Sequence, residues 1–226
     1  MYKRQNDTYL ESPVNTVAPS ISGTTTDRSV LSASPGTWTG APAPTYTYQW
    51  RRCNAAGASC VDIPAATSAT HTLTAADVGS TIRVVVTGTS TAGTATATAP
   101  QTAVVAALAP FVTVAPALSG TTQQGSALTL GQGTWDGTPT ITYARSWQRC
   151  NAAGASCATI PGQTGTTYTL TAADVGSTIR GVVTATNAAG STPATTTQSA
   201  VITATPPVNT VAAALINQNS SAGLSG

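Results

Sequence analysis

The sequence predicts an all-β protein made of two tandem β-sandwich domains and the start of a third repeat. Three observations support this prediction: an internal repeat of constant length, short runs rich in Thr, Val and aromatic residues, and Pro and Gly turns between those runs. No stretch of useful length shows helical periodicity.

The repeat keeps one length along the chain. Cys53 returns as Cys150, 97 positions later, and Trp50 returns as Trp147 with the same displacement. The opening segment PVNTVAP at position 13 returns as PFVTVAP at 110 and as PVNTVAA at 207. We therefore expect four parts, which are a tail (1–12), unit one (13–109), unit two (110–206) and a partial third repeat or terminal docking strand (207–226).

Each unit reads as a series of short strands. In unit one the runs at 45–50, 71–73, 81–88 and 94–99 are rich in Thr, Val and aromatic residues, and several alternate with period two. Turns such as SPGTWTG and TAGT separate them. About seven strands in a unit of this length are typical of a β-sandwich.

The same pattern predicts the cores. Alternation along TIRVVVT places Ile82, Val84 and Val86 on one face. Unit two has Gly181 where unit one has Val84, so its core must be repacked locally. The residues that we expect in the two cores are Trp50, Trp147, Ile82, Val84, Val86, Ile179 and Val183.

The composition argues against several classes of partner. Charged residues make up 7% of the chain and the formal net charge is +2, with no basic cluster that would neutralise nucleic-acid phosphates. No apolar run approaches the roughly 20 residues that span a bilayer. The first residues, MYKRQNDTYLESP, lack the apolar core of a secretory signal, so we expect the chain to stay inside the cell, to leave it by lysis, or to have been processed.

The four cysteines lie in two copies of the octapeptide CNAAGASC, as Cys53 and Cys60 and as Cys150 and Cys157. This spacing, with Asn and Gly available for a turn, suits a hairpin closed at its neck by a disulfide. A zinc site would need four ligands at closer spacing, and no His or acidic residue accompanies these cysteines. We predict two structural disulfides and an oxidising environment; free thiols and a metal site are the alternatives.

The candidate catalytic residues have simpler structural interpretations. The only histidine, His71, is replaced by Tyr168 in unit two, a change that a catalytic base would not tolerate. Asp77 and Asp174 lie in the same turn of the two units, where we expect their carboxylates to cap backbone N–H groups. We therefore predict no enzymatic activity, no cofactor and no metal.

Two further features are candidate contact surfaces. Trp38 and Trp135 recur in GTWTG and GTWDG and have the rings to stack on a sugar, although packing in the core or at its edge is the interpretation that we favour. The tail departs sharply in composition from the repeats, which suits a docking segment that orders on a partner; disorder is the alternative. The candidate docking residues are Tyr2, Lys3, Arg4 and Tyr9.

The strands that carry Trp50 and Trp147, the segment LTAADVGSTIRVVV and the segment ATNAAG resemble the immunoglobulin-like (Ig-like) fold. The unit as a whole is similar to bacterial Ig-like repeats that occur in tandem in actinobacterial surface proteins and in tailed-phage virion proteins. The resemblance implies Ig-like sandwiches over 13–206. One departure is that the positions that antibody-type domains bridge with a disulfide look aliphatic here, near Leu31 and Val86.

From the residues and the resemblance we expect a structural or adhesive protein. Since the cysteines look oxidisable and no signal is evident, our first expectation is a phage decoration, fibre or tail-associated protein at the virion surface. It would dock on other capsid or tail proteins through 1–12 and make weak contact with a host-surface glycan. The alternatives are a bacterial cell-surface adhesin, a carbohydrate-binding accessory module of a secreted protein, and a filament subunit that donates 207–226.

Overall fold

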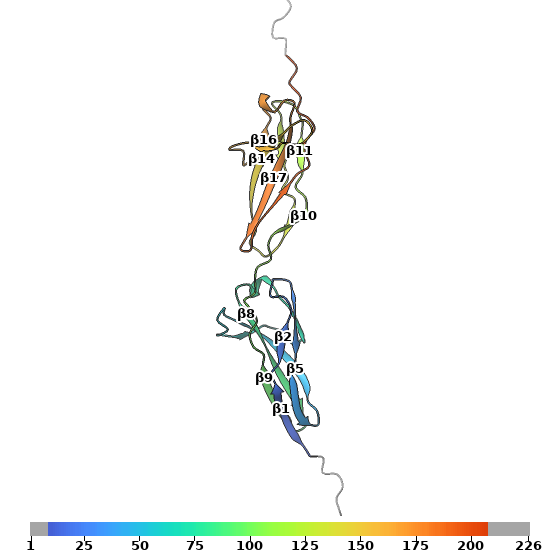
Figure 1. Ribbon diagram of the computed structural model, residues 1–226, viewed down its shortest axis with the longest axis vertical. Coiled ribbons are helices and arrows are strands. Elements are labelled where there is room, and N and C mark those ends of the chain that lie inside the picture. The colour runs from blue at the N-terminus through green and yellow to red at the C-terminus, as the bar shows by residue number, and fades with distance from the viewer. Residues whose placement is uncertain (1–8, 208–226) are drawn as a thin grey trace, which may run out of the picture.

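The computed structural model describes residues 9–207, in which two β-sandwiches lie end to end (Figure 1). Unit one contains β1 (Glu11–Val17), β2 (Ser20–Ser22), β3 (Val30–Ser34), β4 (Thr37–Ala41), β5 (Thr45–Cys53), β6 (Val61–Asp62), β7 (Thr70–Thr72), the 3-10 helix η1 (Ala75–Asp77), β8 (Thr81–Ser90) and β9 (Gly93–Thr98). Unit two contains β10 (Phe111–Val114), β11 (Leu118–Gly120), β12 (Ala127–Leu130), β13 (Thr134–Asp136), β14 (Thr142–Cys150), β15 (Ala158–Thr159), β16 (Thr167–Thr169), η2 (Ala172–Asp174), β17 (Thr178–Asn187) and β18 (Gly190–Thr195).

Each unit packs a four-stranded sheet against a three-stranded sheet. In unit one the strand orders are β6-β5-β8-β9 and β2-β3-β7, and β1 pairs separately with β4. Unit two repeats this arrangement as β15-β14-β17-β18, β11-β12-β16 and β10-β13. The pairings between these strands are antiparallel, as in Ig-like sandwiches. The predicted fold class of two tandem sandwiches is confirmed. The partial third repeat or terminal docking strand (207–226) lies, from residue 208 on, outside the described residues and stays a prediction.

Each unit has nine strands rather than about seven, for two local reasons. Pro19 separates β1 from β2 and Pro116 separates β10 from β11. Because proline has no N–H for a ladder, the first segment of each unit divides into two strands. The two-residue strands β6 and β15 come directly after the second cysteine of each unit and complete its hairpin.

One tryptophan occupies the centre of each core. Trp50 and Trp147 are fully buried, and their indole N–H groups donate to the carbonyls of Ser68 and Gly165 at 2.8 and 3.0 Å. These hydrogen bonds remove the cost of burying an unpaired donor. The residues expected in the cores, Trp50, Trp147, Ile82, Val84, Val86, Ile179 and Val183, are all 0% exposed.

The core of unit two compensates for the glycine at position 181. A Cβ atom on Gly181 would lie 2.5 Å from Cδ1 of Leu130. Unit one has Val84 and Ala33 at the two corresponding positions, and both pack in its core. The leucine of unit two therefore fills the space that the valine fills in unit one.

Leu130→Ala should destabilise unit two by about 2–5 kcal/mol, because it leaves a cavity beside Gly181. Gly181→Val should also destabilise it, since the new side chain overlaps Leu130. The double variant recreates the pair of unit one and should be more stable than either single variant. Urea unfolding of the four proteins measures this; additive losses would contradict the compensation.

Candidate functional site

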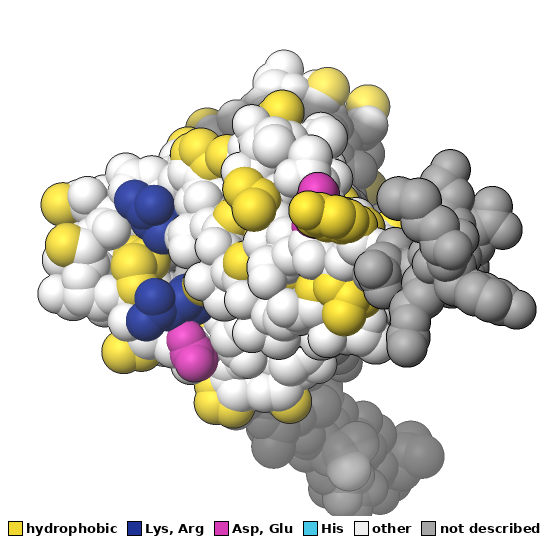
Figure 2. Space-filling model, turned by 90° about the horizontal axis from the view of Figure 1, so that it is seen from below, with side chains coloured by type: hydrophobic (Ala, Val, Ile, Leu, Met, Phe, Trp, Pro, Cys, Tyr) yellow, Lys and Arg dark blue, Asp and Glu magenta, His cyan; other side chains and the backbone are white. Residues whose placement is uncertain are grey.

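Few charged side chains lie on the face of the molecule that Figure 2 shows. Four features of the structure are candidates for function. They are the disulfide-closed loops, the buried aspartates, the half-buried tryptophans and the contact between the units. Within residues 9–207, no group of three or more His, Cys, Asp or Glu side chains is placed to hold a metal ion. The helices of this described part are too short to cross a membrane.

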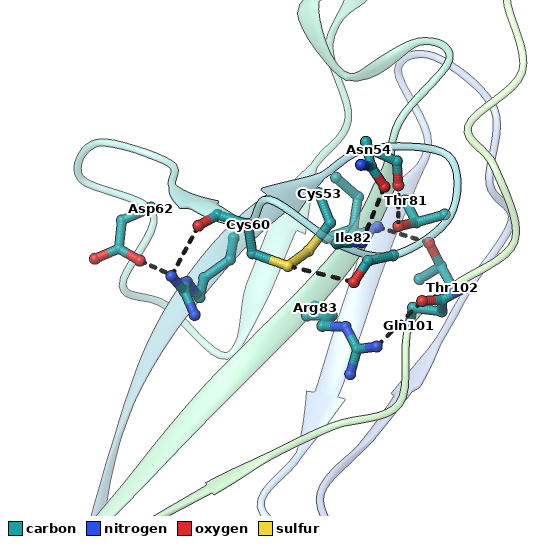
Figure 3. Close-up of a disulfide and its surroundings, with 12 residues drawn as sticks. Cys53, Asn54, Cys60, Asp62, Thr81, Ile82, Arg83, Gln101 and Thr102 are labelled. Carbon is teal, nitrogen blue, oxygen red and sulfur yellow. Dashed lines mark hydrogen bonds and ion pairs between the residues drawn. A yellow bond between two sulfur atoms is a disulfide. The ribbon is translucent and has the colours of Figure 1, made fainter.

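The cysteines form the two predicted disulfides, Cys53–Cys60 (Figure 3) and Cys150–Cys157. The Cα atoms of each pair lie 4.0 Å apart. Each bond closes a hairpin whose apex, NAAGAS, is mostly exposed. Because the apex has the same sequence in both units, the protein presents one loop surface twice.

Hydrogen bonds inside the loop hold its shape. In unit one the side chain of Asn54 accepts the N–H of Ala58 at 2.9 Å, and the hydroxyl of Thr81 donates to the carbonyl of Asn54 at 3.0 Å. Gly57 has a φ of 79° and lies directly against the side chain of Gln101, which leaves no room for a Cβ. The loop is therefore a fixed surface rather than a loose one.

A hollow of about 290 Å³ lies beside the loop of unit two. Its lining includes Ser156, Thr159, Ser177 and Arg149. In unit one the residue that corresponds to Thr159 is Asp62, which pairs with Arg51 at 2.8 Å. The two loops therefore have the same apex but different surroundings.

A buried carboxylate connects the two sheets of unit one. Asp77 is 0% exposed; its Oδ2 accepts the N–H of Thr74 at 2.9 Å, and its Oδ1 accepts Nε of Arg52 at 2.8 Å. Arg52 belongs to β5 in the four-stranded sheet, and His71, whose Nε2 lies 3.5 Å from Asp77, belongs to β7 in the three-stranded sheet. We call this group the aspartate clasp.

Unit two contains the same clasp with a different partner on the second sheet. Asp174 is 0% exposed and accepts hydrogen bonds from Arg149 and from the N–H of Thr171, both at 2.7 Å. The hydroxyl of Tyr168, which replaces His71, donates to Asp174 at 2.8 Å. His71 and Tyr168 therefore occupy one structural position.

The clasp keeps its carboxylates charged. Burial alone would raise the pKa of Asp77 and of Asp174. The backbone N–H of the capping threonine, the arginine and the threonine hydroxyl outweigh burial, so the pKa of each carboxyl lies below its ordinary value. Burial, together with the contact to Asp174, raises the pKa of Tyr168. A carboxylate held in this way suits a structural cap better than proton transfer near neutral pH.

Trp38 and Trp135 lie at the edge of each core and are half-buried. Their indole N–H groups donate to the carbonyls of Pro35 and Gln132 at 2.7 and 2.9 Å. Trp38 packs on Tyr46 with ring centroids 5.8 Å apart and lies over Gly88. These contacts correspond to the edge-packing interpretation and leave only part of each ring for a ligand.

The tail is described only in part. Tyr9 is 83% exposed, and Tyr2, Lys3 and Arg4 lie outside the described residues. The docking role of the tail stays a prediction.

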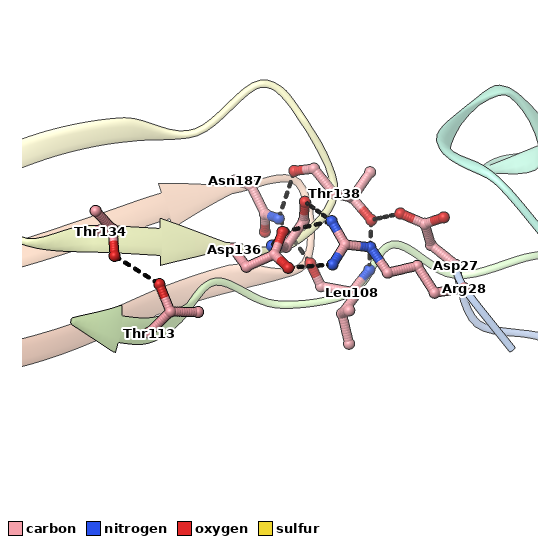
Figure 4. A network of polar contacts seen from close by, with 9 residues as sticks. Asp27, Arg28, Leu108, Thr113, Thr134, Asp136, Thr138 and Asn187 are labelled. Atoms are coloured by element: carbon pink, nitrogen blue, oxygen red, sulfur yellow. Dashed lines mark hydrogen bonds and ion pairs between the residues drawn. The ribbon is translucent and has the colours of Figure 1, made fainter.

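A network of polar contacts connects unit one to unit two (Figure 4). The guanidinium of Arg28 pairs with the carboxylate of Asp136 through both Nη atoms, and Nη2 donates to the carbonyl of Gly137 at 3.2 Å. Oγ1 of Thr138 donates to Oδ2 of Asp27 at 2.6 Å, and both of these residues are 4% exposed. We call this network the joint.

The ion pair of the joint persists over a wide pH range. The hydrogen bonds from Arg28, with one from the N–H of Gly137, lower the pKa of Asp136 to about 2. The hydrogen bond to Asp136 in turn raises the pKa of Arg28. Both groups are therefore charged from mildly acidic to alkaline pH.

Sequence reasoning missed the residues of the joint. Arg28 corresponds to Gly125 in unit two, and Asp136 corresponds to Thr39 in unit one. A charge that only one unit has can mark a contact outside the repeat, as here, or a pair within that unit, as for Arg51 and Asp62. The arginines of the clasps were missed for another reason: each lies 25 residues from its aspartate, and only the strand register brings them together.

No family model matches the chain, and no curated protein matches it. Among solved structures it is similar to the N-terminal four Ig domains of Dscam1 isoform 4.44, at 14% identity over 87% of this chain and 46% of that chain, with a TM-score of 0.30. It is also similar to Sidekick-1 immunoglobulin domains 1–5 (18% identity, 87% and 40% covered, TM-score 0.30) and to extracellular domains 3–5 of Drosophila OTK (15%, 82% and 62%, 0.33). The chain spans about half the length of the first of these structures. The assignment of the chain to the Ig-like class rests on its own strand order and not on these similarities.

Reducing the disulfides should lower the melting temperature of both units. Each bond closes an eight-residue loop, which the chain-entropy model relates to about 2–3 kcal/mol of stability. Calorimetry with and without reductant measures the effect. As a control, replacing Cys53 and Cys60 with serine should shift the transition of unit one alone. A melting temperature unchanged by complete reduction would show that the bonds do not stabilise the fold.

Acid should destabilise both units through their clasps. The pKa of Asp77 and of Asp174 is lower in the folded state than in the unfolded state. Their contribution to the free energy of unfolding is therefore complete above the unfolded pKa of about 3.9, and it is lost as the pH falls through the lower folded value. Asp77→Asn and Asp174→Asn should destabilise their units at neutral pH by about 3 kcal/mol, the low end of the cost of breaking a buried pair, since each leaves a partly buried arginine without its carboxylate. Urea unfolding from pH 7 to pH 2 measures both effects. Variants with the pH profile of the wild type would contradict this role.

Proposed function

We propose that the chain is a non-enzymatic Ig-like display protein, and specifically a decoration, fibre or tail-associated component of a phage virion. The observation that carries the proposal is an end-to-end pair of sandwiches that presents the same disulfide-closed loop twice. Such an arrangement holds contact surfaces away from an attachment point. It also allows two weak contacts to act together, because the second binding event becomes intramolecular.

The residues that most resemble catalytic groups support a non-enzymatic role. Asp77 and Asp174 are fully buried and paired with arginines. The single histidine, His71, takes a place that Tyr168 takes in unit two, against the same buried carboxylate. These groups serve the fold, and the contacts that remain available are those of exposed loops.

The disulfides support a location outside the reducing cytoplasm, since such bonds persist in oxidising environments. The virion assignment is supported by the resemblance of the units to repeats of tailed-phage virion proteins. In this proposal the tail (1–12) docks on a capsid or tail protein, and the loops make weak contact with a glycan of the host surface. A bacterial cell-surface adhesin is the second candidate, favoured by the same disulfides.

Deleting residues 1–12 should abolish incorporation into phage particles, because the proposed docking residues Tyr2, Lys3, Arg4 and Tyr9 are then absent. Quantifying the protein in purified particles by mass spectrometry measures this. The matched control is deletion of 208–226, which should leave incorporation unchanged. Normal incorporation without 1–12 would refute the docking role. Loss of incorporation on deletion of 208–226 alone would instead favour attachment by strand donation.

A further inference from the structure

The residues that form the joint differ from their counterparts in the other unit, both on the surface of unit one and on the surface of unit two. On unit one it uses Asp27 and Arg28, where unit two has Gln124 and Gly125. On unit two it uses Asp136, Thr138 and Asn187, whose amide donates to the carbonyls of Leu108 and Thr138 at 2.7 and 2.9 Å. Unit one has a different residue at each of these three places. The corresponding pairs are Asp136 and Thr39, Thr138 and Ala41, and Asn187 and Ser90.

Arg28 adopts a backbone conformation that suits glycine. Its φ is 70°, and Gly125 at the equivalent position has a φ of 85°. The backbone N–H of each residue donates to the equivalent carbonyl, of Leu73 in unit one and of Leu170 in unit two. The turn therefore forms well with glycine, and an arginine there adds strain. Unit one accepts this strain at the residue that reaches unit two.

The connection between the units, at 106–108, is hydrogen-bonded to unit one at its first residue and to unit two at its last. Ala106 forms a parallel β-bridge with Thr26 of unit one. The N–H of Leu108 donates to Oγ1 of Thr138 of unit two at 2.7 Å. Only Ala107 lies between the two tied residues, and each residue has only two soft backbone dihedral angles. One side-chain contact across this short connection is enough to remove most of the remaining rotation.

Polar contacts, rather than apolar packing, set the angle at the joint. A cleft of about 400 Å³ remains beside the contact, between Leu73 and Ala75 of unit one and Pro139 of unit two. An exposed ion pair alone stabilises little. Here the planar guanidinium of Arg28 binds both carboxylate oxygens, which fixes direction as well as distance. The buried hydrogen bond from Thr138 to Asp27 fixes a second point.

We propose that the joint is a matched pair of end surfaces that sets both the order of the units and the angle between them. The surface formed by Asp27 and Arg28 fits a following repeat of this fold in which the end of the strand equivalent to β13 and the bend after it offer the pattern Asp-Gly-Thr, as at 136–138. Unit two has Gln124 and Gly125 at the positions that correspond to Asp27 and Arg28, so it does not form that surface. This inference goes beyond the proposed function, because it holds wherever the protein is displayed.

Residual dipolar couplings of the full chain, measured by NMR in a neutral alignment medium, test this proposal. In the wild type the couplings of both units should fit one alignment tensor. Arg28→Gly, which installs the residue of unit two, should give two tensors of different magnitude. Asp136→Thr, which installs the residue of unit one, should give the same result from the other side. The double variant should be no looser than either single variant, because the two residues act as one pair.

The control is Arg51→Gln, which removes an exposed ion pair within unit one, to Asp62, and should leave one tensor. The fit of the couplings inside each unit reports whether that unit is still folded, so a folding defect is distinguished from a loosened joint. A single tensor in Arg28→Gly would overturn the proposal, since the angle would then be fixed without the ion pair. A double variant looser than both single variants would also contradict it.

Discussion

The rest of the structure depends on the buried carboxylate of the aspartate clasp. Antibody-type domains bridge their sheets with a disulfide, but here the corresponding region contains buried aliphatic residues such as Leu31 and Val86, and the cysteines lie in the side hairpins. Asp77 instead receives Arg52 from one sheet and lies beside His71 of the other. Removing one member of a buried pair costs about 3–5 kcal/mol, against about 5–15 kcal/mol for the whole stability of a domain. The free energy that depends on the clasp is therefore a large enough part of the stability of each sandwich to decide whether it folds.

The turn that the clasp holds is also in contact with the joint. Asp77 caps Thr74, and Leu73, the residue before Thr74, accepts the backbone N–H of Arg28 at 3.0 Å. The turn that the clasp holds thus places the arginine that reaches unit two. The loops, closed by their disulfides, project from sandwiches whose relative orientation this arginine helps to set. A display role needs both properties, a contact surface of fixed shape and a fixed direction in which to present it.

Most of the fold could be predicted from the sequence because the repeat reports it twice. The constant displacement of Trp50 and Cys53 to Trp147 and Cys150 predicts the two units, and strand alternation predicts the buried face of β8. Residues that differ between the two units could not be predicted in this way. Arg28 at a glycine position and Asp136 at a threonine position act only across the boundary between units, so neither has a counterpart to predict it. The structure has more strands than the sequence predicts for three reasons. Pro19 and Pro116 divide the first segment of each unit, the two-residue strands β6 and β15 are too short to show a pattern, and the turn expected at SPGTWTG contains β4.

A display role in which the loops keep a fixed direction requires the two units to behave as one rigid rod. Small-angle X-ray scattering of the full chain in solution tests this most directly, since the profile depends on the angle between the units and on its spread. The account predicts a profile fitted by a single extended arrangement with the orientation seen here, unchanged between pH 4 and pH 8 because the pKa of Asp136 is about 2. A profile that requires an ensemble of bent arrangements would contradict it.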